Sequence, residues 1–193
     1  MEKMEKTYVF LDGAYLSEIS RYFGGGKYII YDLNQFAITL AKSESLWCEK
    51  VFYYTAPPFQ CPIPTPEEKQ KRANYDRFIK KLERIPGFVT REGRCQKINE
   101  SFHQKGVDTL ITMDLLNTLS EKKIKTIIIL TCDTDFVPIL NKLRENGIKV
   151  ILCYFSDRIR KSKFSMSNNL FTACSKKTLL TKTHFEKSQF LPN

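Results

Sequence analysis

The chain has 193 residues, 42% of them apolar, and a formal net charge of +10 at pH 7. This length suits one domain with a tail or insertion, and the apolar fraction is enough for an ordinary core. The longest apolar run is too short to span a membrane, and the opening MEKMEKTYVF has no apolar signal-peptide core. We therefore expect a cytoplasmic protein with no membrane partner.

Short apolar runs alternate with longer amphipathic segments along the chain. The apolar runs predict strands at residues 7–12, 47–56, 88–95, 125–132 and 148–155. The amphipathic segments predict helices at residues 14–22, 32–44, 67–85, 105–122 and 136–147. Asp32 is expected to be the N-cap of the second helix. Strands that alternate with helices indicate parallel βαβ units, so we expect a three-layer α/β sandwich with a mainly parallel five-stranded sheet.

The last 38 residues, from Ser156, are polar and basic with scattered apolar residues. We expect them to form a helix over the sheet edge and then a ragged tail, packed on the same domain. The basic excess lies here and in residues 65–105, which hold 11 basic and 6 acidic groups, whereas residues 156–193 hold 8 and 2. This distribution favours a polyanionic partner, nucleic acid first, although a solvated basic surface fits it too.

Acidic residues stand at the predicted ends of two strands and at the start of one helix. Asp12 ends the first strand, Asp133 and Asp135 follow the apolar run IIILTC, and Asp108 begins the helix before the fourth strand. Ligands of parallel sheets bind beyond the carboxyl ends of the strands. If the first and fourth strands are neighbours, as a central switch point requires, these acids share one crevice.

Carboxylates gathered in one crevice stay ionised together only when a cation lies among them. An all-oxygen ligand set suits Mg²⁺ or Mn²⁺, and such ions activate water and stabilise charge on a phosphoryl group. Each acid alone also has a simpler interpretation: a strand-ending turn for Asp12, a helix N-cap for Asp108 or Asp135, and an exposed helix position for Asp114. Asp133 fits such an interpretation least well.

Two other kinds of site have weak support. DTDFV matches the start of the aspartate-nucleophile motif of haloacid dehalogenase-type phosphatases, but Asp157 is the only later aspartate and no downstream acidic pair follows. The six cysteines include no Cys-x-x-Cys pair, so a zinc site is disfavoured, and without a secretion signal we expect no disulfides.

Three motifs resemble the NYN domain in its LabA-like branch, part of the PIN-like nuclease superfamily. They are FLDGAYL, QKGVDTLITMDLL and TCDTDFVPILNKLRENGIKVIL, in this order, and the PGFVTREGR stretch also resembles the family. The resemblance covers roughly residues 7–155, so we assign an NYN/PIN-like domain to residues 1–155. It implies a five-stranded parallel sheet of order 3-2-1-4-5 and a metal-dependent ribonuclease activity.

The resemblance also assigns roles to single residues. It implies that Asp12, Asp108 and Asp133 bind the metal and that Asp135 acts with them in catalysis. The residues that it places around these acids are Asp114, Tyr15, Thr131 and Thr134. Tyr15 stands where the family usually has an asparagine, and Cys132 stands where it usually has a glycine.

Basic side chains are expected to hold the phosphates of an RNA along this crevice. The candidates are Lys105, Arg72, Arg94, Arg158, Arg160 and Lys161. Tyr53, Tyr54 and Phe59 are candidates for stacking on bases, although strand alternation favours one of the two tyrosines in the core and the other on the surface.

Together these features predict an endoribonuclease that uses Mg²⁺ or Mn²⁺ to hydrolyse single-stranded or structured RNA. The alternative is a catalytically weak RNA-binding or regulatory module that keeps the fold, and Tyr15 is its best support. The resemblance further implies possible homo-oligomers.

Overall fold

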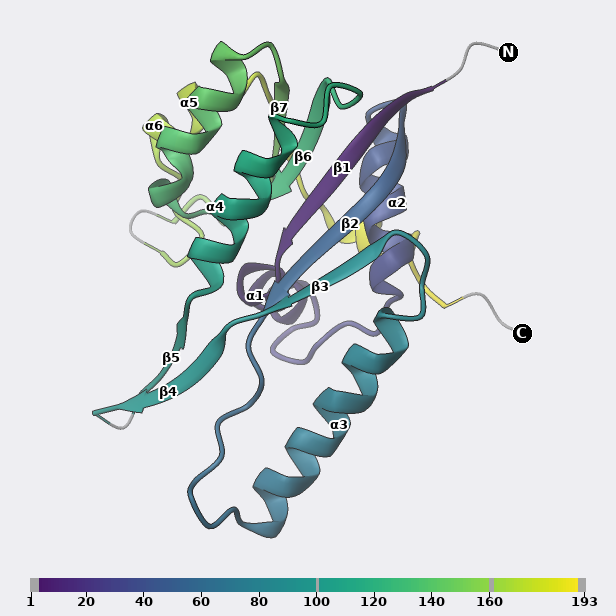
Figure 1. Cartoon of the computed structure of the whole chain (residues 1–193). Helices are drawn as coiled ribbons and strands as arrows, with labels where there is room; N and C mark the ends of the chain where they lie inside the picture. The colour runs from purple at the N-terminus through teal and green to yellow at the C-terminus, as the bar shows by residue number, and fades with distance from the viewer. Residues whose placement is uncertain (1–3, 100, 160–161, 191–193) are drawn as a thin grey trace.

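The computed structural model describes residues 4–99, 101–159 and 162–190, and it is built around one parallel sheet (Figure 1). In spatial order the strands of this sheet are β3 (Phe88–Glu92), β2 (Leu46–Thr55), β1 (Glu5–Asp12), β6 (Thr126–Leu130), β7 (Lys149–Tyr154) and β8 (Lys176–Leu179). The order of the first five strands is the predicted 3-2-1-4-5, and the α/β fold class is confirmed.

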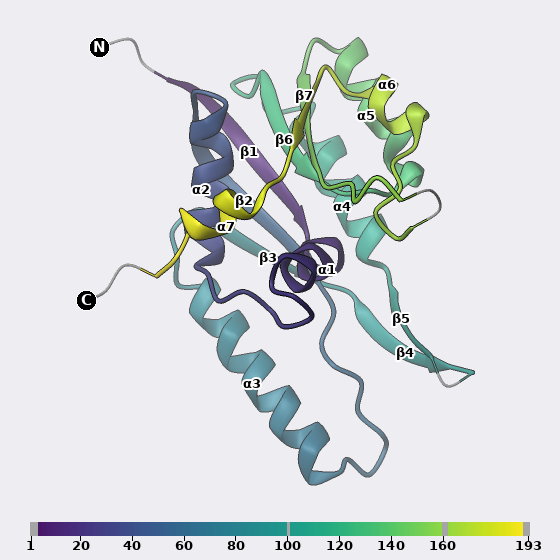
Figure 2. The same ribbon diagram turned by 180° about the vertical axis from the view of Figure 1, so that it is seen from behind.

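Helices cover both faces of the sheet, so the sheet is the middle of three layers (Figures 1 and 2). On one face lie α1 (Gly13–Phe23), α2 (Leu33–Ser43) and α7 (Lys182–Glu186), and on the other lie α4 (Val107–Thr118), α5 (Val137–Glu145) and α6 (Asn168–Ala173). Strand β1 supplies both cores, because Val9 and Leu11 pack with one set of helices and Tyr8 and Phe10 with the other. This is the double burial expected of a central parallel strand.

Two elements extend past the carboxyl edge of the sheet, α3 (Pro66–Leu82) and the antiparallel pair of β4 (Arg94–Ile98) and β5 (Ser101–Lys105) (Figure 1). A capping box begins α3, in which Thr65 accepts from the Glu68 N–H and the Glu68 side chain accepts from the Thr65 N–H. The single strand predicted for residues 88–95 was wrong, because Gly93 divides it between two sheets.

The C-terminal segment is more ordered than the expected helix and ragged tail. It contributes β8 to the sheet edge, between the short helices α6 and α7. Leu180 and Phe185 are buried in the same core as α1 and α2. Strand β8 was not predicted, because a short edge strand reading KKTL is mostly exposed and lacks an apolar run.

In the part of the chain that the structure describes, no helix combines the length and the apolar character needed to cross a lipid bilayer.

We predict that Phe185→Ala lowers the free energy of unfolding by about 3–5 kcal/mol. The ring is fully buried and packs against Tyr31, Phe36 and Phe23, with ring centroids 5.0, 4.9 and 5.8 Å away. The matched control is Phe190→Ala, because that ring is 50% exposed and its removal should cost less than about 1 kcal/mol. Urea unfolding measures both, and equal losses would show that the C-terminal segment is not part of the core.

Candidate metal centre

Asp12 is the last residue of β1, and its side chain is fixed by the first turn of α1. Its Oδ1 atom accepts hydrogen bonds from the backbone N–H groups of Ala14 and Tyr15, at 3.0 and 3.2 Å. Gly13 permits this sharp strand-to-helix turn, because a Cβ atom there would lie 2.5 Å from the Tyr54 carbonyl oxygen. The Asp-Gly pair therefore fixes a carboxylate at the carboxyl edge of the sheet.

Asp133 is held in a similar way beyond the end of β6. Its Oδ1 atom accepts from the Asp135 N–H at 2.9 Å and caps the short 3₁₀ helix η1 (Thr134–Phe136). The buried Thr131 hydroxyl accepts from the Asp133 N–H at 3.1 Å, so Thr131 stabilises the loop between β6 and η1. Thr134 and Asp135 themselves are exposed.

Asp108 approaches from the other side, on the first turn of α4. Gly106 precedes this helix with a φ of +82°, a left-handed conformation that favours glycine. The Asp108 side chain is exposed, and it has no hydrogen-bond or ion-pair partner among the described residues. No fold-stabilising contact of that kind therefore explains this carboxylate.

The pairing of β1 with β6 brings these acids together. Leu11 and Leu130 are register partners, so the residues that follow each strand emerge side by side at the switch point of the sheet. The pKa of Asp12 is raised to about 6, chiefly by burial and to a smaller extent by the charges of Asp108 and Asp133, whereas two backbone hydrogen bonds oppose the rise. The pKa of Asp108 is raised by partial loss of hydration, although the side chain is largely exposed, and by the charges of Asp133 and Asp135.

The carboxylate oxygens of the three aspartates suit a divalent cation chemically, but the side chains lie too far apart to bind one together. Hard carboxylate oxygens that repel one another are the ligands that Mg²⁺ and Mn²⁺ prefer. However, no three acidic, histidine or cysteine side chains of the described residues converge closely enough to hold an ion as they stand. An ion held by all three aspartates therefore requires some rotation of these side chains.

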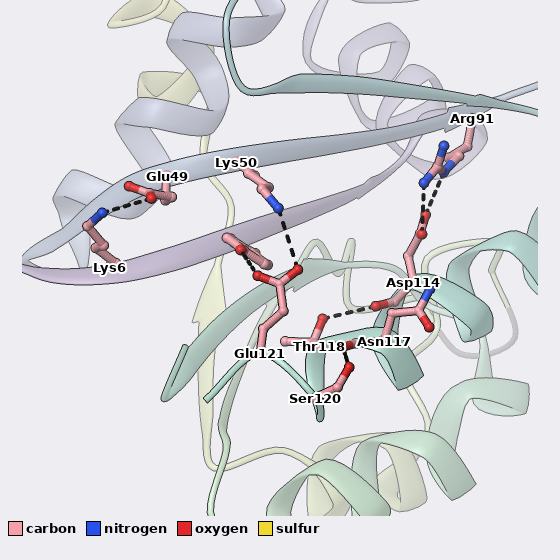
Figure 3. A network of polar contacts seen from close by, with 10 residues as sticks. Lys6, Glu49, Lys50, Arg91, Asp114, Asn117, Thr118, Ser120 and Glu121 are labelled. Carbon is pink, nitrogen blue, oxygen red and sulfur yellow. Dashed lines mark hydrogen bonds and ion pairs between the residues drawn. The ribbon is translucent and has the colours of Figure 1, made fainter. Parts of the chain in front are cut away.

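Asp114 is engaged by a different set of residues (Figure 3). Its carboxylate is buried and accepts two hydrogen bonds from the Arg91 guanidinium, at 2.9 and 3.1 Å, and one from the Tyr54 hydroxyl at 3.0 Å. These contacts join α4 to β3 and β2. Asp114 is thus a structural anchor for the helix that carries Asp108, and neither Arg91 nor Tyr54 was predicted as its partner.

The Tyr15 side chain is hydrogen-bonded to the backbone just after β7. Its hydroxyl donates to the Phe155 carbonyl oxygen and accepts from the Phe155 N–H, both at 3.0 Å. The side chain therefore ties α1 to the end of β7, and only its backbone N–H contacts Asp12. Cys132 lies half-buried beside the acids, where burial and then the charges of Asp12 and Asp133 raise its pKa to about 11.

The predicted nucleic-acid contacts occupy several places. Arg94 and Lys105 are register partners at the base of the β4–β5 pair, both exposed, and they line a surface cavity of about 420 Å³ with Thr109 of α4. Arg72 is bound to Asp76 on its own helix at 2.8 Å, and Arg158 is exposed.

Other predicted contacts cannot be placed in the same way. Arg160 and Lys161 lie outside the described residues. The expectation that only one of Tyr53 and Tyr54 is buried was wrong, because the sheet is covered on both faces and the two rings enter opposite cores.

Comparison with known proteins identifies the family. The model of the NYN domain matches residues 6–180. The chain belongs to the NYN domain family. The NYN domain family is a family of PIN-like nucleases. In this NYN domain, the three predicted motifs place Asp12, Asp108 and Asp133 at the strand and helix ends described above.

One solved structure resembles the chain. A solved structure of a protein of unknown function, VPA0982 from Vibrio parahaemolyticus, matches the NYN domain with a TM-score of 0.60 and 15% identity, over 96% of this chain and 98% of that chain. At this identity the likeness shows the fold alone. The search of curated proteins finds no match.

We predict that Arg91→Met destabilises the NYN domain by about 1–3 kcal/mol, because the buried Asp114 carboxylate then keeps only the Tyr54 hydroxyl as a side-chain partner. Arg72→Met is the matched control, since it breaks an exposed ion pair with Asp76 and should change stability by less than about 0.5 kcal/mol. Thermal and urea unfolding measure both changes. Similar effects of the two substitutions would contradict the anchoring role of Arg91.

We further predict a pH dependence from Asp12. Its pKa is about 6 in the folded chain and about 3.9 when unfolded, so the folded state binds the proton more tightly. The metal-free NYN domain should therefore lose stability as pH rises from about 4 to 6. Asp12→Asn keeps the helix cap and should remove this part of the loss. Melting in chelator across this pH range tests it, and superimposable parent and variant profiles would refute the shift.

Proposed function

We propose that this NYN domain is a metal-dependent endoribonuclease that hydrolyses RNA phosphodiester bonds at the edge formed by Asp12, Asp108 and Asp133. The observation that carries the proposal is the placement of these three carboxylates at the switch point of the sheet, where Asp12 and Asp133 stand at or just beyond the ends of the paired strands β1 and β6 and Asp108 lies in the first turn of α4. Membership of a PIN-like nuclease family also supports a nuclease function. A purely structural role explains this arrangement poorly, because like charges brought together oppose folding.

Asp12, Asp108 and Asp133 would hold Mg²⁺ or Mn²⁺, and the bound ion supplies an activated water and charge stabilisation at the phosphoryl group. The three aspartates differ in how firmly the protein orients their side chains. Asp12 and Asp133 are oriented by backbone N–H groups, whereas Asp108 is exposed and unconstrained by hydrogen bonds within the described residues. Asp135 lies next to them and adds negative charge that is felt at Asp108.

Basic groups near α4 would position the RNA backbone. Arg94 and Lys105 line one cavity with Thr109, the residue after Asp108, so a phosphate bound there would lie beside the first turn of α4, which carries Asp108. Each guanidinium or ammonium contact to phosphate releases counterions and favours binding at low salt. The same cavity is lined by Gly93, where a Cβ atom would lie 2.6 Å from the Lys105 carbonyl oxygen, so the backbone approaches closely there.

A second candidate is an RNA-binding or regulatory module with weak or no catalysis. Tyr15 favours it, because its hydroxyl is used by the Phe155 backbone and does not support the acids as an asparagine would. The two functions differ in one respect that can be measured. Only the nuclease requires a metal that the three carboxylates bind.

We predict that Asp108→Asn reduces RNA cleavage roughly 100-fold or more, because it removes a metal ligand worth several kcal/mol in the transition state. Asp108 has no hydrogen-bond partner in the described structure, so this variant should keep parental stability. Asp133→Asn should act likewise while RNA binding persists or tightens, since repulsion of phosphate falls. The assay is cleavage of single-stranded and structured RNA with Mg²⁺, Mn²⁺ or chelator.

Asp32→Asn provides the matched control. Asp32 caps α2 by accepting from the Gln35 N–H at 2.8 Å, and it is not among the charges that act on Asp12 or Asp108. The Asp32→Asn protein should cleave RNA like the parent, because asparagine caps helices as well as aspartate does. Cleavage that continues in chelator, or that survives Asp108→Asn, contradicts the metal mechanism. A parent that binds RNA without cleaving it favours the second candidate.

A further inference from the structure

A large cavity lined by aromatic side chains adjoins the acidic edge on the side away from Arg94 and Lys105. It has a volume of about 740 Å³ and lies between α1, the segment of residues 24–32, β2 and α3. Its aromatic walls are Tyr28, Tyr31, Tyr53, Tyr75 and Phe78. The volume falls within the range of about 300–1,000 Å³ typical of small-molecule sites. Nothing in the proposed chemistry of the acids uses these rings.

The cavity is connected to the site through the turn after β1. The Tyr53 ring is packed so tightly against this turn that a Cβ atom on Gly13 would lie 2.9 Å from it. Leu16 and Ser17, about one helical turn after Asp12, form part of the wall. The wall of the cavity is therefore in contact with the turn that follows Asp12.

Two of the aromatic side chains that line the cavity remain accessible to solvent. Tyr28 is 64% exposed and Phe78 is 40% exposed, whereas Tyr53 is buried beneath them. Phe78 and Tyr53 meet edge to face with centroids 6.1 Å apart, so the base of the cavity is a fixed aromatic surface. Exposed aromatic rings around a concave site mark a binding surface better than single exposed residues do.

Polar groups at the rim suit a base and its phosphate. Asn74 lines the cavity, and its Oδ1 atom accepts from Gln70 at 2.8 Å and from Arg77 at 2.6 Å. These bonds leave the Asn74 amide N–H groups without a partner in the described structure, and they hold the Arg77 guanidinium beside the cavity. A nucleobase edge can accept from the amide while its phosphate pairs with the arginine.

We propose that this cavity binds an unstacked nucleobase of single-stranded RNA, next to the phosphate that is cleaved. The proposal rests on the proposed nuclease function and specifies its substrate. Base stacking on aromatic side chains tolerates any sequence, because every base has a π-face. A base held in a stable duplex cannot enter the cavity, so the site selects single strands, loops and ends over paired RNA.

The test measures binding in chelator, where the proposed cleavage does not proceed. A labelled ten-nucleotide single-stranded RNA is compared with an abasic strand of the same length, which keeps the sugar-phosphate backbone. The parent should bind the abasic strand more weakly. Tyr28→Ala should weaken binding of the base-containing strand by roughly 5- to 100-fold and leave binding of the abasic strand unchanged. Tyr28→Phe keeps the ring and should bind like the parent.

Trp47→Ala is the matched control, because Trp47 is 56% exposed at the opposite edge of the sheet, where β2 begins. It should bind both strands like the parent. Equal affinity of the parent for the two strands, no RNA binding, or equal weakening of both strands by Tyr28→Ala would each overturn the proposal. A change in oligomeric state of Tyr28→Ala without a change in RNA binding would overturn it in favour of a second copy of the chain.

A separate cleavage assay distinguishes this proposal from the nuclease on which it rests. Base-dependent binding that needs Tyr28, in a protein that does not cleave RNA in Mg²⁺ or Mn²⁺, supports the cavity and contradicts the nuclease. Metal-dependent cleavage with no preference for bases supports the nuclease and contradicts the cavity.

Discussion

Repulsion between three carboxylates at one edge of a parallel sheet is the constraint on which the site depends. The pairing of β1 with β6 brings Asp12 and Asp133 together, and α4 adds Asp108. Burial first, and then the charges of neighbouring aspartates, raise the pKa values of Asp12 and Asp108. In the proposed function, a divalent cation bound at the point where the sheet topology reverses would relieve this repulsion.

The same aspartates also have structural tasks, and these explain why the edge stays ordered. Asp12 caps α1 and Asp133 caps η1, so backbone N–H groups partly offset the charge at each. Asp114 is different, because Arg91 compensates its charge, the Tyr54 hydroxyl donates a hydrogen bond to it, and these contacts fix α4 against β2 and β3. Of the acids along this part of the chain, Asp108 has the least structural justification, which makes it the most informative position to change.

Much of the fold and the three central acids could be predicted from sequence, because both leave local patterns. The buried strands are short apolar runs; Asp12 ends one of them, and Asp133 stands three residues after the end of another. The partners of Asp114 could not be predicted, since Arg91 and Tyr54 lie 23 and 60 residues away and pairing over such distances leaves no periodicity. The β4–β5 pair and β8 were missed for a related reason, because their residues are largely exposed and lack the apolar alternation that marks a strand.

The most direct test is anomalous scattering from crystals of the protein grown with Mn²⁺. The account predicts a manganese peak at the carboxyl edge of β1 and β6, with oxygen ligands from Asp12, Asp108 and Asp133 at distances usual for such ions. It also predicts that crystals of the Asp108→Asn protein lose this peak or show it much weakened. A parent structure with no peak at this edge, or with manganese bound only elsewhere, would contradict the account.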